Sequence, residues 1–287
     1  MNITDNALSH AVESFAAYMA PKSEAELNSP WAWMDYDGDG VRFSIFQVYE
    51  TLRTAAGQIR AARQQSARPA ERAQMVLGQY HTAYRDLNAV LLNVGEPDID
   101  RAPTMGEWAV RRVLGIMQSA DTHFLTAIVF ARRGEAKRIS NEIFLDYFVI
   151  DESETERRSQ AEGSFDEIRE YHAKIHQRIV SELSDLSEEE LEQPFSFWES
   201  TRFAIEFRLH RFDAHFIQHI VQVEKTLAAI GLVPDEAKRL LRRVYNALAE
   251  VEAATIGMEG LPTAVQEEAT SEVVALHEEI SALPIRY

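Results

Sequence analysis

Apolar residues recur every three or four positions along most of the chain, and this spacing predicts α-helices. The most regular run covers residues 205–230, where eight apolar residues keep the helical period: Ile205, Leu209, Phe212, Phe216, Ile220, Val223, Leu227 and Ile230. Other runs predict helices at residues 4–19, 41–63, 70–93, 104–128, 164–183, 232–254 and 262–283. No segment shows the alternation of a half-buried strand. The sequence therefore predicts an all-α fold.

Polar stretches and capping patterns divide the predicted helices into groups. The stretch QQSARPAER reads as a linker, and serine or threonine followed three residues later by glutamate predicts helix starts at Thr104 and Ser164. The long charged connection at residues 133–163 predicts a crossover along a bundle. We predict an N-terminal helical extension at residues 1–69, a four-helix bundle at 70–231 and a C-terminal helical hairpin at 232–287. The hairpin either packs on the bundle or forms the surface of a homodimer.

Charge and composition narrow the classes of partner. Acidic residues outnumber basic ones 46 to 29, so the net charge of −17 repels nucleic acid and anionic lipid. The chain has no cysteine, which excludes disulfides and thiolate ligands of its own. No run approaches the roughly 18 apolar residues of a membrane span, and no secretion signal opens the chain. We expect a cytoplasmic protein with no nucleic-acid or membrane partner.

The best candidate for chemistry is the pair His215 and His219. Residues four apart share a helix face, so two imidazoles at this spacing can bind one metal ion. Arg208, Arg211 and Gln222 fall beside the pair on a helical projection. Without further context, the same spacing is also that of two partly exposed helix histidines, because two ligands do not make a site.

Two segments resemble the DinB-like family of four-helix bundles. The run FRLHRFDAHFIQHIVQVEKTL resembles the family's last helix, and APTMGEWAVRRVLGIM resembles its second. The resemblance covers residues 70–231 and implies a DinB-like bundle in which His215 and His219 are two of three metal-binding histidines. The third is expected eight residues after Trp108, where this chain has Ile116. His123 lies two turns further along that helix, and His81 or Asp121 remains as an alternative third ligand.

Two other patterns resemble metal-binding motifs but are weaker evidence for a metal site. His172 and His176 repeat the four-residue spacing, but the resemblance gives them no ligand role, and we interpret them as histidines at the edge of an apolar stripe. Asp35, Asp37 and Asp39 match the first half of a calcium loop, whose twelfth position should be glutamate. That position is Phe46, so we interpret the segment as an acidic turn.

Two hypotheses for function follow. In the first, a divalent metal such as Zn²⁺ or Ni²⁺ at His215 and His219 activates a water or an incoming thiol, as the family's thiol transferases imply. Arg208, Arg211, Gln222 and His123 would then contact a small-molecule substrate, the arginines by pairing with a carboxylate. In the second, the bundle binds a small molecule or a partner and has lost both metal and catalysis, as Ile116 suggests.

Overall fold

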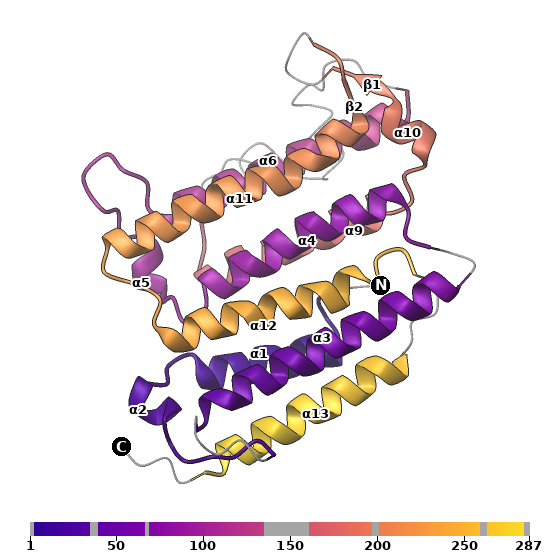
Figure 1. The fold of residues 1–287 in the computed structure, drawn as a ribbon. Helices are drawn as coiled ribbons and strands as arrows, with labels where there is room; N and C mark the ends of the chain where they lie inside the picture. Colours follow the sequence, from indigo (N-terminus) through magenta and orange to yellow (C-terminus); the bar gives the residue numbers. More distant parts are fainter. Residues whose placement is uncertain are drawn as a thin grey trace. The chain divides into compact units, whose positions relative to one another are not determined.

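The computed structural model describes residues 3–34, 40–66, 69–134, 161–196, 201–258 and 263–283. The acidic turn of Asp35, Asp37 and Asp39, and most of the predicted crossover at residues 133–163, lie outside these ranges. The described chain is almost wholly helical and confirms the all-α prediction (Figure 1). One short antiparallel ladder, β1 (Pro194–Phe195) with β2 (Phe203–Ala204), was not anticipated.

The helices group into two compact units. The first unit comprises residues 1–70, 85–93 and 233–287, and the second comprises residues 71–84 and 94–232. One long helix, α4 (Arg72–Val90), contributes its first part to the second unit and its last part to the first. The three segments predicted from sequence, and the packing of the hairpin on the bundle, remain predictions.

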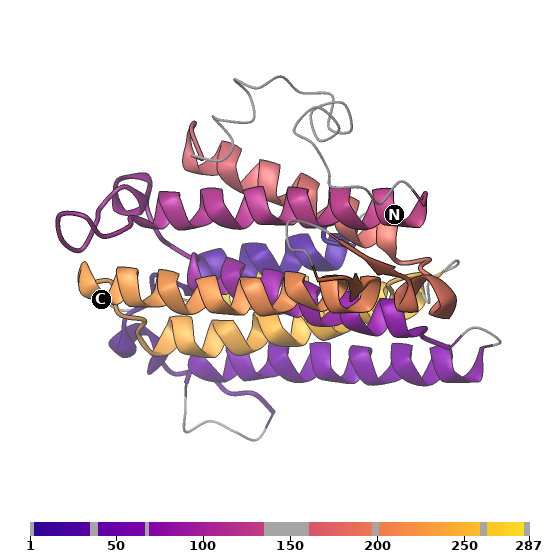
Figure 2. The ribbon, with the colours of Figure 1, turned by 90° about the horizontal axis from the view of Figure 1, so that it is seen from above.

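The first unit joins the two ends of the chain. It contains α1 (Ala7–Met19), α2 (Glu24–Leu27), α3 (Arg42–Gln65), α12 (Glu236–Ala253) and α13 (Thr263–Ser281). α12 packs along α3, and α13 packs on both α1 and α3 (Figures 1 and 2). The apolar stripes that predicted these helices meet in one core, which includes Phe15, Ile45, Leu52 and Leu248. The N-terminal helices and the two C-terminal helices therefore bury their apolar faces in one core.

The second unit contains three of the four helices predicted for the bundle and the first part of the other. Its helices are the first part of α4, α5 (Glu96–Ile99), α6 (Val110–Arg132), α9 (Phe165–Leu183), α10 (Glu188–Glu192) and α11 (Ile205–Ala229). α6 packs against both α11 and α9. α4 joins them through Tyr80, whose ring contacts His176 of α9 and Phe212 of α11.

The ends of these helices test the predicted capping patterns. Ser164 and Glu167 form the predicted capping box at the start of α9. The box predicted at Thr104 is wrong, because α6 begins six residues later, after Ala109, and has no side-chain cap. α11 ends at Ala229, and Gly231 follows with φ of +91°, a conformation that glycine adopts without steric cost.

One helix in the described part of the chain, α6, is long and apolar enough to cross a membrane by length and composition. However, 72% of its apolar window is buried inside the protein. A core helix passes the same test, so α6 is explained by its packing against α9 and α11.

Candidate functional site

The predicted histidine pair lies one turn apart on α11. The apolar stripe of this helix, including Phe212, Phe216 and Ile220, is buried and fixes which face is inward. His219 borders that stripe and is 5% exposed, whereas His215 is half-buried. The ring of Phe124, on α6, packs edge-on against His215 with 5.8 Å between centroids. Both imidazoles therefore stand at the boundary between the core and the surface.

The two rings point their Nε2 atoms at each other, 3.1 Å apart. Gln222 Oε1 lies 3.0 Å from His219 Nδ1, and because a carbonyl oxygen can only accept, His219 Nδ1 donates. In a neutral His219 the Nε2 atom then accepts, so His215 Nε2 donates to it. This assignment leaves His215 Nδ1 as a lone-pair nitrogen, buried and without a hydrogen-bond partner among the described residues.

The surroundings keep both histidines neutral. The pKa of His215 is lowered to about 4, mainly by burial and to a lesser extent by the charges of His219 and Arg211. Burial also lowers the pKa of His219, against the opposing effect of its hydrogen bond to Gln222. Neutral imidazole is the form that binds a metal ion, so the pair is ready to bind one at neutral pH.

Of the four predicted substrate-binding residues, Gln222 and Arg211 lie beside the pair, and Arg208 and His123 have contacts of their own. Gln222 bonds His219, and Arg211 is close enough to act on the pKa of His215. Arg208 is 1% exposed, and its guanidinium lies 5.1–5.8 Å from the ring centroids of Phe195, Phe203 and Phe207. His123 Nδ1 donates to the backbone oxygen of Ser119 at 2.6 Å. Substrate contact by these four residues remains a prediction.

The Nε2 atoms of His215 and His219 are spaced to occupy two coordination positions of one metal ion. Zinc–nitrogen bonds of about 2.0–2.1 Å at a tetrahedral angle bring two ligand nitrogens to about 3.3 Å, close to the 3.1 Å found here. Within the described ranges, no group of three or more histidines or carboxylates is arranged to hold a metal. Ile116 is half-buried on α6 and supplies no ligand. The described residues thus fit a two-histidine site and do not complete the three-histidine set that the resemblance implied.

His81 and Asp121, the suggested replacements, belong to a different cluster inside the second unit. Tyr80 donates to Asp121 Oδ2 at 2.6 Å, and His172 Nε2 lies 4.0 Å from the same oxygen. His81 Nδ1 lies 3.2 Å from His176 Nε2. His172 and His176, interpreted from the sequence as histidines at the edge of an apolar stripe, are 5% and 0% exposed, so both are buried. Sequence reasoning missed this cluster because α4, α6 and α9 each contribute to it.

Burial dominates the acid–base behaviour of the cluster. It raises the pKa of Asp121 well above the usual range, against the opposing hydrogen bond from Tyr80. It also raises the pKa of Tyr80, which the Asp121 carboxyl raises further. Burial lowers the pKa of His172 to about 4, and His172 Nε2 and Asp121 Oδ1 make no hydrogen bond among the described residues. These groups therefore favour their neutral forms.

We expect His172 to make the protein acid-sensitive. Between about pH 6.5 and 4 the unfolded chain binds a proton at His172 that the folded chain does not, so the free energy of unfolding falls as pH falls. A difference of about 2.5 pKa units corresponds to about 3 kcal/mol. Asp121 acts in the opposite direction. Because its pKa is raised in the folded protein, the free energy of unfolding falls as the pH rises above the usual pKa of an aspartate.

Denaturant melts between pH 4 and 7 measure this effect. His172→Leu should reduce the slope of the free energy of unfolding against pH by up to one proton, because it removes the buried imidazole. Equal slopes for wild type and His172→Leu would show that the imidazole titrates normally in the folded protein.

Comparison with known proteins gives one match. A family model described as the DinB superfamily matches residues 79–223, a range that includes His81, Ile116, His215, His219 and Gln222. No curated protein and no solved structure matches the chain.

Proposed function

Because the chain belongs to the DinB superfamily, we propose that His215 and His219 bind a divalent metal ion, such as Zn²⁺ or Ni²⁺, and that the protein acts on a small molecule there. The convergence of the two Nε2 atoms, 3.1 Å apart, is the observation that carries this proposal. The pair lies within the matched residues, on the last helix of the bundle.

The neighbours of the pair support the assignment. Gln222 accepts from His219 Nδ1, as hydrogen-bonding partners of metal-bound histidines do, and so holds the ring with Nε2 directed at the site. Arg211 places a positive charge beside His215, suited to an anionic group of a substrate. When bound, the ion would lower the pKa of a coordinated water or of an incoming thiol. A metal-dependent thiol transferase is therefore the reaction class that we propose.

A second candidate is a bundle that binds a small molecule or a partner without metal or catalysis. Ile116 favours it, since an aliphatic side chain stands where the resemblance implies the third histidine. The Nε2–Nε2 hydrogen bond also satisfies the pair without an ion. The two candidates differ in whether the wild-type protein binds Zn²⁺ at His215 and His219.

We expect the Ile116→His variant to bind Zn²⁺ at least about tenfold more tightly than wild type, because a third imidazole adds a ligand to an incomplete shell. Wild type should bind weakly and release its metal to a mild chelator. Calorimetric titration with Zn²⁺, paired with thermal melts, gives both affinities and shows whether each variant folds. Ile116→Gln is the matched control, since it adds polarity without an imidazole.

The histidine variants decide where the metal binds. His215→Ala and His219→Ala should abolish Zn²⁺ binding while costing less than about 3 kcal/mol of stability, since neither residue lies at the centre of the buried stripe. Zn²⁺ binding that survives both changes would place the metal elsewhere and overturn the proposal. An absence of binding in wild type would favour the metal-free candidate.

A further inference from the structure

A cleft of about 430 Å³ opens in the first unit between α3 and α13. Its size is within the range of small-molecule pockets. Its lining comes from these two helices and from the segment before α3: Trp33, Met34, Gln47, Glu50, Thr51 and Thr54, with Glu268 and Glu272 among those on α13. Neither the superfamily match at residues 79–223 nor the histidine pair on α11 involves this cleft.

The charged side chains among the described lining residues are all carboxylates. Glu50 comes from α3, and Glu268 and Glu272 come from α13, and the described lining residues include no lysine, arginine or histidine. Glu268 and Glu272 are four residues apart, which sets them about 6 Å apart along the helix. Thr51 Oγ1 donates to Glu272 Oε2 at 2.7 Å and so ties one carboxylate to the opposite helix.

An aromatic side chain forms part of the wall. The ring of Trp33 packs against Phe43, at the start of α3, with 6.2 Å between centroids, and this contact helps to fix its position. The face of an indole attracts a cation. Met34 beside it is 79% exposed and presents a polarizable thioether to a ligand. The cleft thus combines an indole ring, an apolar thioether side chain and spaced carboxylates.

We propose that this cleft binds a linear aliphatic polyamine. In such a molecule, three or four methylenes separate neighbouring ammonium groups by about the same distance as the one-turn rise between Glu268 and Glu272. The methylenes could then pack against Trp33 and Met34, and an ammonium group could lie over the Trp33 ring. A bare divalent ion needs several donors around one point, and no group of three or more such donors is arranged that way in the described ranges. Spaced carboxylates therefore match a chain of charges better than a single one.

The net charge of −17 attracts polyamines to the whole surface, so the test must separate site binding from general attraction. Calorimetric titration of the full chain with spermidine at several salt concentrations is the measurement. Glu272→Gln and Trp33→Leu should each weaken binding about two- to fivefold. Glu267→Gln removes the same charge from the same helix outside the lining and should leave the affinity unchanged.

Three results would overturn the proposal. Equal losses for Glu272→Gln and Glu267→Gln would show that binding follows net charge alone. If Trp33→Leu and Glu272→Gln both bind spermidine as tightly as wild type, spermidine binds outside this cleft. Displacement of spermidine by equimolar Ca²⁺ would make the cleft a metal site. None of these outcomes depends on Zn²⁺ binding at His215 and His219, so this proposal and the proposed function can fail separately.

Discussion

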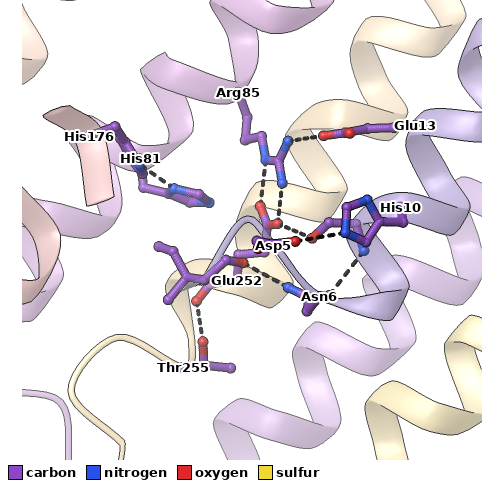
Figure 3. A network of polar contacts seen from close by, with 11 residues as sticks. Asp5, Asn6, His10, Glu13, His81, Arg85, His176, Glu252 and Thr255 are labelled. Atoms are coloured by element: carbon purple, nitrogen blue, oxygen red, sulfur yellow. Dashed lines mark hydrogen bonds and ion pairs between the residues drawn. The ribbon is translucent and has the colours of Figure 1, made fainter. Parts of the chain in front are cut away.

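We expect Glu252→Ala to lower the free energy of unfolding by about 3–5 kcal/mol, because it leaves a buried guanidinium without its principal partner. Glu252 of α12 and Arg85 of α4 are 2% and 1% exposed. Arg85 Nε donates to Glu252 at 2.7 Å, and Arg85 Nη2 donates to the other carboxylate oxygen. Ser9 Oγ donates to Glu252 at 2.6 Å. Arg85 lies between Glu252 and Glu13, and its Nη1 atom donates to Glu13 at 2.6 Å (Figure 3).

Chemical denaturation of Glu252→Ala and Glu250→Ala measures this contribution against a matched control. Glu250 lies on the same helix and pairs with Arg53 and Arg60, but these side chains are 27–52% exposed, so its loss should cost less than about 1 kcal/mol. Replacing both buried partners, with Arg85→Met and Glu252→Leu, should recover part of the loss. Similar losses for Glu250→Ala and Glu252→Ala would mean that the Arg85 pair is hydrated.

The buried ion pair shows what a helical pattern cannot predict. Arg85 and Glu252 are separated by 167 positions in the sequence. Each lies on an amphipathic helix, where a charged residue is expected on the exposed face. Only the packing of α12 and α1 beside the last part of α4 places them together inside the first unit. The helical spacing of apolar residues predicted the helices, whereas tertiary packing determines which helices lie against each other.

The histidines illustrate the same limit. The spacing of His215 and His219 predicted a pair on one helix face, and the structure places their Nε2 atoms 3.1 Å apart. The same spacing at His172 and His176 gave no indication that both are buried, because burial comes from Tyr80, Tyr84 and Phe216 on other helices. Local periodicity therefore predicts which residues share a face, but not which faces enclose a polar cluster.

We expect Ile220→Ala to lower the free energy of unfolding by about 2–5 kcal/mol, because it removes most of a buried aliphatic side chain and leaves a cavity. Ile220 is 1% exposed on α11, in the stripe that also holds Phe212 and Phe216. Phe212 packs against the rings of Tyr80 and Phe124, so this stripe faces helices α4 and α6. The cost should appear mainly as a lower midpoint of denaturation with an unchanged slope.

Ile217→Ala is the matched control, since it makes the same chemical change three residues earlier on the same helix. Ile217 is 45% exposed, and alanine has the higher helix propensity, so this variant should lie within about 0.5 kcal/mol of wild type. Urea denaturation of the two variants, followed by far-ultraviolet circular dichroism, gives the comparison. Equal losses would mean that the side of α11 carrying Ile217 is covered in solution, as by a second copy of the chain. A neutral Ile220→Ala would place the wrong face of α11 in the core, and His215 and His219 would then lose the boundary position on which the proposed metal site depends.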